Sequence, residues 1–519
     1  MRDTALPDDP QALKALVGEL VGQLEARDQT LSSLQARIAQ LQLQIAVLRR
    51  ARFGRRSERL DQELGQLELM LDELHSAQAE ALAAVSAKPE AAQRPARRPL
   101  PAHLPRETQT HVPEETACPA CGGALKPLGE DVTELLEYIP ASFKVIRQVR
   151  PKLACGCCDA IVQAPAPSRP IARGLAGPGL LAHVLVSKYS DHLPLYRQSA
   201  IYAREGVELP RSTLAEWVGG AHHLLRPLFE ALRTYVLDTA KLHGDDTPIP
   251  VLAPGNGKTA TGRLWTYVRD DRPAGSEEAP AVWFAYSPNR KGEHPKRHLK
   301  TFKGILQADA YAGFGALYDS GRVVPAACWA HVRRKFYELA EAHNSPLAQE
   351  ALQRIGALYA IEVEIRGQPP DVRRSVRQAR AGPVLDELHH WLQDTLRGVS
   401  RKSGLGSAIG YALKLWPALT RYRDDGRVEI DNNAAERALR AVALGRKNYL
   451  FAGSDAGGER AAGIYSLIGT AKLNGLDPEA YLREVISRIA DHPVNQVDEL
   501  LPWKLMPQGD QNSRLAECA

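Results

Sequence analysis

The order of apolar segments between residues 240 and 327 constrains the fold of this 519-residue chain more than any other feature. Three short segments rich in β-branched and aromatic residues come first, followed by a basic segment with helical character and two further apolar segments. We expect strands at 242–252, 264–268, 281–286, 304–308 and 323–327, with a helix at 294–302. The sequence therefore predicts a mixed sheet with acidic residues on its first and fourth strands.

This order of elements is typical of a ribonuclease-H-like fold, in which the first and fourth strands are neighbours. The first strand carries Asp245 and Asp246, either of which could be the first acid of a site, and Asp309 ends the fourth. Crowded carboxylates repel one another unless a cation neutralises them. Glu436 lies 127 residues after Asp309 and would complete a cage for Mg²⁺ or Mn²⁺. Two such ions about 4 Å apart carry out phosphoryl transfer in many enzymes.

Each acid also has an ordinary interpretation. Asn433 and Glu436 have the spacing of a capping box at the start of a helix. Asp309 could be a simple strand-end residue. The occurrence of all three acids on suitable elements favours the metal site. We expect the basic residues after Glu436 to contact DNA phosphates, and these are Arg437, Arg440, Arg446 and Lys447.

A second basic run follows the fifth expected strand. Cys328 and His331 have the C-x-x-H spacing of a metal-binding pair, but no second pair lies nearby in the sequence. We therefore expect a helix packed behind the acids rather than a zinc site. Its DNA-facing residues would be Arg333, Arg334 and Lys335.

The cysteines predict a separate metal site. Cys118 and Cys121 form one C-x-x-C pair, with glycines beside it that permit a tight turn. Cys155 and Cys158 form the second pair, although Cys157 could replace a neighbour. Four thiolates in two such pairs fit a tetrahedral, structural Zn²⁺, and the spacing between the pairs predicts strands near 135–139 and 143–149.

The N-terminal segment has a heptad pattern. One apolar position contains Val17, Leu24, Leu31, Ile38 and Ile45, and the alternate position contains Leu13, Leu20, Leu34, Leu41 and Leu48, broken only by Arg27. Such a stripe requires a partner helix, so the pattern predicts a coiled coil. A second leucine-rich helix is expected at about 58–84. Residues 49–59 hold six arginines and one glutamate, which suits either a phosphate backbone or a solvated basic face.

Two further regions have helical periodicity. Segments 180–189, 196–205 and 212–225 fit a helix-turn-helix with Ser212 as N-cap, a layout that also occurs in helical domains that do not read DNA. Residues 338–425 are expected to form a helical insertion between the second and third acids. Four arginines in it suggest a possible DNA track, namely Arg373, Arg374, Arg377 and Arg380.

Together these motifs resemble the insertion-sequence sixty-six (IS66) family of DDE transposases, over about residues 13–505. The sharpest blocks are 118–123, 189–197, 242–252, 307–314, 328–336 and 430–458. The resemblance implies that Asp245, Asp309 and Glu436 are the catalytic acids. The block that normally reads Asp-Glu-Thr reads Asp-Asp-Thr here, so Asp246 takes the place of the glutamate.

We therefore expect a multidomain α+β chain. Its expected parts are a coiled coil and basic helix (10–84), a linker (85–113), a four-cysteine zinc-binding module (114–168), a helical DNA-binding region (169–236), a ribonuclease-H-like α/β catalytic domain (237–337 and 426–490) with the helical insertion (338–425), and a C-terminal tail (491–519). The expected activity is metal-dependent DNA cleavage and strand transfer. An inactive DNA-binding regulator and a nuclease without strand transfer are the alternatives.

The expected partners are the terminal repeats of the element, target DNA and a second copy of the chain through the coiled coil. The resemblance adds small accessory proteins from the same element. No apolar run reaches the roughly 20 residues of a membrane span, and acidic residues replace the basic start of a signal peptide. The expected location is the bacterial cytoplasm, with nucleoid association when DNA is bound.

Overall fold

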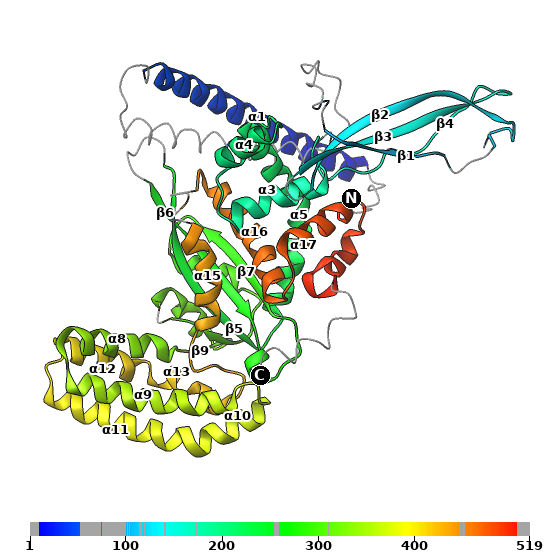
Figure 1. Ribbon diagram of the computed structural model, residues 1–519. Coiled ribbons are helices and arrows are strands. Elements are labelled where there is room, and N and C mark those ends of the chain that lie inside the picture. Colours follow the sequence, from blue (N-terminus) through cyan, green and yellow to red (C-terminus); the bar gives the residue numbers. More distant parts are fainter. Residues whose placement is uncertain are drawn as a thin grey trace.

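The chain is a mixed α/β protein built around two sheets (Figure 1). The computed structural model describes residues 10–51, residue 74 and residues 100–505, apart from 101, 103, 114–116, 119, 140–141, 173, 254–258, 310, 446–447 and 449–451. Figure 1 shows the smaller sheet and a helical bundle at opposite ends, with the larger sheet between them. No helix in these ranges combines the length and apolar character that a bilayer crossing requires.

The heptad segment forms one continuous helix, α1 (Pro10–Ala51). Of its heptad positions, Ile38 and Leu41 are buried, whereas Leu24 is 50% exposed. The exposed leucine lies on the apolar stripe that a coiled coil would pack against a partner helix. The expected second helix at 58–84 and most of the basic cluster at 49–59 lie outside the described residues.

The cysteine region forms the smaller sheet, in the order β1-β3-β2 with β4 also paired to β3. Strands β2 (Leu125–Ile139) and β3 (Ser142–Cys155) make a long antiparallel hairpin, so the expected strands between the cysteine pairs are confirmed. β1 (Arg106–Thr110) lies within the stretch expected to be a linker. Its backbone pairs with β3 in parallel, so this part of the stretch is a strand of the smaller sheet. β4 is Ile161–Gln163.

Three helices connect this sheet to the larger one. They are α3 (Pro178–Tyr189), α4 (Leu195–Arg204) and α5 (Arg211–Leu237). The Glu137 carboxylate of β2 accepts the N–H groups of Gly179 and Leu180 at 3.2 and 2.7 Å, and so caps α3. Ser212 is not the N-cap of α5, because that helix already begins at Arg211, after Pro210. Pro210 fixes the chain direction there and makes no side-chain cap.

The larger sheet has five strands in the order β7-β6-β5-β8-β9. Its first and fourth strands in sequence are therefore adjacent, as predicted. All five expected strands form, within a few residues of the expected bounds. They are β5 (Lys241–Val251), β6 (Ala260–Arg269), β7 (Ala281–Ser287), β8 (Gly304–Gln307) and β9 (Val323–Ala326). Between them lie α6 (Glu293–His298) and α7 (Gly315–Tyr318).

C-terminal helices complete this body. They are α15 (Asn433–Gly445), α16 (Asp455–Leu473) and α17 (Pro478–Arg488). α16 runs along edge strand β7, where Ser466 Oγ and Thr470 Oγ1 accept the N–H groups of Phe284 and Val282. These side chains satisfy backbone donors that the edge of a sheet leaves unpaired. Helices α3, α5, α16 and α17 share one hydrophobic core with both sheets.

A second core holds the helical bundle between β9 and α15. Its helices are α8 (Trp329–His343), α9 (Pro346–Ile365), α10 (Pro370–Val376), α11 (Gly382–Gly398), α12 (Gly404–Lys414), α13 (Trp416–Leu419) and α14 (Arg421–Asp424). Trp329 links α8 to α13 within the bundle, since its indole N–H donates to the Leu419 carbonyl at 3.0 Å.

The expected DNA track on this bundle is wrong for two of its four arginines. Arg373 and Arg377 are buried, at 1% and 0% exposure. Both pair with Glu362, at 3.3 and 2.6 Å, and Arg373 also pairs with Glu429 at 2.8 Å. Their charges hold the bundle to the segment before α15, so these two arginines are not available to DNA.

Candidate functional site

The register of the larger sheet brings Asp245 and Asp309 to the same level. His243 of β5 lies opposite Gln307 of β8 in the parallel pairing. Each acid follows two residues later, Asp245 within β5 and Asp309 just beyond the end of β8. Side chains two residues apart share a face of a sheet. The folding of β5 beside β8 therefore brings together two acids that are 64 residues apart in sequence.

The neighbouring acid Asp246 has a different environment. Its side chain is 1% exposed and pairs with Arg263 at 3.0 Å and Arg290 at 2.8 Å. These two guanidiniums neutralise Asp246 inside the protein. Asp245 has no such cation among the described residues, and its Oδ1 accepts the backbone N–H of Asp246 at 2.7 Å. Of the two adjacent aspartates, Asp245 is thus the one without a basic partner among the described residues.

Glu436 reaches this site from the first turn of α15. The start of that helix is fixed by Asn432, which is fully buried. Its Oδ1 accepts His243 Nδ1–H at 3.0 Å, and its amide nitrogen donates to the Gly244 carbonyl at 2.9 Å. These bonds tie the residue before α15 to the strand just before Asp245. The acid one helical turn later is thereby positioned against the sheet.

Glu436 does not form the capping box that its spacing permits. The Asn433 N–H donates instead to Asp431 Oδ1 at 3.1 Å, so Glu436 is not its partner. Glu436 lies toward α8, with Oε1 3.7 Å from His331 Nε2 and Oε2 3.9 Å from an Arg334 nitrogen. Glu436 Oε1 is buried and has no hydrogen-bond partner among the described residues. An unsatisfied buried carboxylate oxygen is costly, and a bound cation would relieve that cost.

The electrostatics show that the three acids interact. Burial raises the pKa of Asp245 to about 7; the Asp246 N–H opposes this shift, and the carboxylates of Asp309, Asp246 and Glu436 add to it. Burial also raises the pKa of Asp309, although the Tyr311 N–H and the Arg290 guanidinium oppose the shift. A carboxyl group with a raised pKa holds a proton more tightly because its negative charge is poorly compensated. The Asp309 and Glu436 carboxylates therefore act electrostatically on Asp245, although the carboxylate oxygens of the three acids do not all lie within 4.8 Å of one another. We call Asp245, Asp309 and Glu436 the acid cluster; within it, Asp309 pairs with Arg290 at 3.5 Å.

His331 and Cys328 stand beside this cluster. Cys328 Sγ, a His331 nitrogen and a Glu436 oxygen all lie within 4.8 Å of one another. The sequence showed the C-x-x-H pair but no further ligand, and the third group comes from α15 instead. Cys328 also has a structural contact, since its sulfur accepts the Asn432 N–H at 3.2 Å. It thus links the start of α8 to the start of α15.

The four predicted zinc ligands come together at the base of the β2–β3 hairpin. Their sulfur atoms lie within 4.8 Å of one another, with Cys118 to Cys158 at 3.4 Å and Cys121 to Cys155 at 3.4 Å. The Cys157 N–H lowers the pKa of the Cys155 thiol to about 6, which favours the thiolate that binds metal. Four soft ligands in this arrangement fit a closed zinc site without an open position. Cys157 itself is not among the four.

The predicted DNA contacts are distributed around the acids. On α8, Arg333, Arg334 and Lys335 are all exposed, and Lys335 Nζ lies 4.7 Å from the centre of the Tyr411 ring. On α15, Arg437 and Arg440 are exposed. The remaining two predicted contacts, Arg446 and Lys447, lie outside the described residues.

Sequence reasoning missed the residues that hold the acids in place. Asn432 was overlooked because the next residue, Asn433, had the better capping spacing. Arg263 and Arg290 were also missed, since nothing in sequence shows that they would meet Asp246. The one available signal was the pair of adjacent aspartates, because two neighbouring acids on a buried strand require at least one cation between them.

Models of known protein families match most of the described chain. Residues 173–460 match the model described as Transposase IS66 family. Residues 115–159 match the zinc-finger binding domain of transposase IS66, and residues 466–503 match the IS66 C-terminal element. Residues 40–108 match the model described as Transposase C of IS166 homeodomain. The first match alone covers more than half of the chain.

Similar proteins occur in the bacterium Sinorhizobium fredii. The uncharacterized protein y4hP is 46% identical over 492 residues, which cover 90% of this chain and 89% of the relative. The uncharacterized protein y4qI is 38% identical over 534 residues, covering 97% of this chain and 98% of the relative. The uncharacterized protein y4jD is 40% identical over 413 residues, covering 78% and 81%.

Proposed function

Because the chain belongs to the IS66 family of transposases, we propose that it cleaves DNA at the ends of an insertion sequence and joins the freed ends to target DNA. The observation that carries this proposal is the cluster of Asp245, Asp309 and Glu436, three acids from distant segments with raised pKa values at the first two. The strand order of the larger sheet, with the first strand beside the fourth, supports a ribonuclease-H-like catalytic domain.

The cluster fits one or two Mg²⁺ or Mn²⁺ ions, which would supply the positive charge that activates an attacking oxygen and stabilises a leaving oxygen. Asp245 would act only after losing its proton, since the protonated form is a poor ligand. Glu436 would turn its unpartnered Oε1 toward the same position. His331 and Arg334 border that position and would contact the phosphate, which carries negative charge.

The proposed reaction has two in-line steps at phosphorus. In the first, a water oxygen bonds to the phosphorus at the end of the element while the 3′ oxygen leaves as a hydroxyl. In the second, that 3′-hydroxyl oxygen bonds to a target phosphorus while the target 3′ oxygen leaves. Neither step requires a covalent bond to the protein, so catalysis depends on positioning and charge compensation.

Other parts of the chain would support this reaction. The exposed leucine on α1 is consistent with a coiled coil between two copies, which would hold two element ends together. The zinc module and the α4–α5 pair would contribute to DNA recognition. Small accessory proteins of the element are further expected partners. Because the substrate is DNA, the proposed location is the bacterial cytoplasm, at the nucleoid.

The proposal is tested with purified full-length protein, DNA carrying the element's ends, Mg²⁺ and a target plasmid. We expect cleaved and joined products from the wild type, and a loss of about 10²–10³-fold or more in Glu436→Gln, which keeps the shape but removes the charge. Glu338→Gln is the matched control, because Glu338 is an exposed acid on the neighbouring helix α8 outside the cluster.

Three outcomes separate the candidate functions. Cleavage without joined product would favour a nuclease over a transposase. Tight binding of element ends with no cleavage, under conditions in which Mg²⁺ is bound, would favour a DNA-binding regulator. Full activity in Glu436→Gln would remove the basis of the proposed site.

A further inference from the structure

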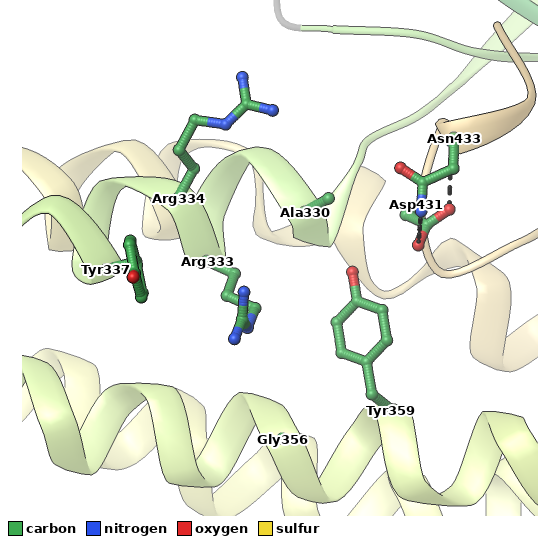
Figure 2. Close-up of a pocket in the computed structure, with 8 residues that line it drawn as sticks. All are labelled: Ala330, Arg333, Arg334, Tyr337, Gly356, Tyr359, Asp431 and Asn433. Atoms are coloured by element: carbon green, nitrogen blue, oxygen red, sulfur yellow. Dashed lines mark hydrogen bonds between the residues drawn. The ribbon is translucent and has the colours of Figure 1, made fainter. Parts of the chain in front are cut away.

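A cavity opens beside the acid cluster, between helices α8 and α9 and the segment that precedes α15 (Figure 2). Its volume is about 590 Å³, which is within the range of small-molecule sites. Figure 2 shows Arg333 projecting from α8 toward α9, while Arg334 projects from the other side of α8. Tyr359 rises from α9 with its hydroxyl toward Asp431 and Asn433. The cavity thus has a cationic wall and a polar end.

The lining groups match the parts of a nucleotide. Arg333 makes no ion pair with a carboxylate of the described residues, and its guanidinium lies 6.0 Å from the Tyr337 ring. A free guanidinium is suited to phosphate, and an exposed tyrosine ring is suited to stacking against a base. At the far end, the Tyr359 hydroxyl points toward Asp431 and Asn433 (Figure 2), and Asp431 accepts from Asn433 Nδ2 at 2.8 Å. These acceptors and donors are of the kind that bind base edges.

Gly356 lines the cavity and adds no side chain to it. It lies in the interior of α9, where glycine costs up to about 1 kcal/mol relative to alanine. A Cβ added to Gly356 would have nothing within 4 Å, so no close packing requires the glycine. The backbone there is also not in the left-handed region. Gly356 is exposed, and a longer side chain at this position would extend into the open space that it lines.

The cavity adjoins the proposed catalytic cluster. Arg334 lines it and lies 3.9 Å from Glu436, and Asp431 and Asn433 line it just before that acid in sequence. A phosphate held at the acids would therefore have its neighbouring nucleotide at the mouth of the cavity. We propose that this cavity binds one unpaired nucleotide of the element-end DNA, with its phosphate at Arg333 and its base between Tyr337 and Tyr359.

This inference rests on the proposed function and adds a specific substrate contact. An enzyme that binds an unpaired base must separate it from its partner, and a mismatch lowers that cost. The wild type should therefore bind end DNA more tightly when a mismatch is placed at one position next to the scissile phosphate. We expect the affinity for end DNA to rise about tenfold when the mismatch is at that position. This change is similar in size to the contribution of one base–aromatic stacking contact.

The discriminating variant is Gly356→Phe, which fills the cavity, with Gly356→Ala as the matched control. Both should fold, because the added atoms enter open space and alanine favours the helix. Gly356→Ala should keep the mismatch effect, whereas Gly356→Phe should lose it. Circular dichroism and thermal unfolding of both variants verify the fold.

Photocrosslinking provides a direct readout. End DNA with 5-iodouracil at each position around the scissile bond should crosslink to Tyr337 or Tyr359 from one position only. That crosslink should disappear in Gly356→Phe and persist in Gly356→Ala. An unchanged crosslink or mismatch effect in Gly356→Phe would overturn the proposal, as would crosslinks that map entirely outside the cavity.

Parallel cleavage assays separate this inference from the proposed function. If Glu436→Gln is inactive while Gly356→Phe binds and cleaves as the wild type does, the nucleotide site is wrong and the transposase function stands. If Glu436→Gln cleaves normally, the proposed function fails whatever the cavity binds. Absence of end-DNA binding by the wild type would count against both.

Discussion

Two clusters of acids in this protein differ in how far basic side chains neutralise their negative charge. In the bundle, Glu362 and Glu429 are compensated by buried arginines, with Arg377 Nε and Nη2 both bonded to Glu362 at 2.7 and 2.6 Å. At the sheet, Asp245 has no basic partner among the described residues, and its neighbours Asp309 and Glu436 add negative charge. Buried charges in proteins are normally paired, so Asp245 is the acid in these two clusters that a bound cation would most stabilise.

The pKa values express this difference. Although burial acts to raise it, the Arg373 guanidinium lowers the pKa of Glu429 below its usual value. At the sheet, burial raises the pKa of Asp245 to about 7, and the nearby carboxylates act in the same direction. The bundle cluster therefore contributes to stability, whereas the sheet cluster stores unfavourable charge that a proton or a divalent cation can neutralise.

The largest expected effect tests the compensated cluster. Arg377→Met removes a buried cation and leaves Glu362 with only the longer Arg373 pair, which should cost about 3–5 kcal/mol of unfolding free energy. Denaturant unfolding of the full chain, followed by circular dichroism, measures this loss in the helical bundle.

Arg380→Met is the matched control for that change. Arg380 lies one turn along and pairs with Glu364, but both side chains are about half exposed. Solvent screens an exposed ion pair, so this variant should differ little from the wild type in unfolding free energy. Equal destabilisation by the two variants would show that the buried cluster is not structural.

A smaller effect is expected at the link between the two regions. Asn432→Ala leaves His243 and the Gly244 carbonyl without their buried partner, which should cost about 1–3 kcal/mol. Because Glu436 lies one turn after Asn432, the variant should lower kcat of DNA cleavage more than it raises KM. Steady-state cleavage of end DNA at a temperature where the variant remains folded measures this split.

Asn433→Ala serves as the comparison for Asn432→Ala. The Asn433 side chain donates to Asp431 and is partly exposed. The variant should retain wild-type stability within about 1 kcal/mol, since no fully buried group loses its partner. If the two variants lowered kcat equally, Asn432 would have no special role in positioning Glu436.

Sequence was sufficient for the groups that recur at fixed spacing. The two cysteine pairs predicted a four-sulfur cluster, and the order of elements predicted that the first and fourth strands of the sheet would be adjacent. Those predictions depend on local spacing and on the adjacency of two strands, which the pattern of elements specifies.

Sequence was insufficient wherever the outcome depended on which long side chains meet across the fold. Arg373 and Arg290 look alike in sequence, yet one is buried against Glu429 and the other spans Asp246 and Asp309. The choice between Asp245 and Asp246 also depended on arginines from two other segments. Helix α9 provides a further example, because the role suggested for Gly356 requires knowledge of the space beside it.

The central claim is that Asp245 has no compensating cation among the described residues. It is tested most directly by measuring Mn²⁺ binding to the full-length protein by electron paramagnetic resonance between about pH 5.5 and 8.5. Because the folded pKa of Asp245 is raised to about 7, its proton competes with the metal below that pH. Affinity should therefore rise by up to about tenfold per pH unit below the pKa and level off above it.

Asp245→Asn should bind Mn²⁺ weakly and lose this dependence, while Glu338→Gln should match the wild type. That result would establish the cluster as a site poised for a divalent cation. Affinity that does not change with pH in the wild type, or that survives intact in Asp245→Asn, would contradict the account.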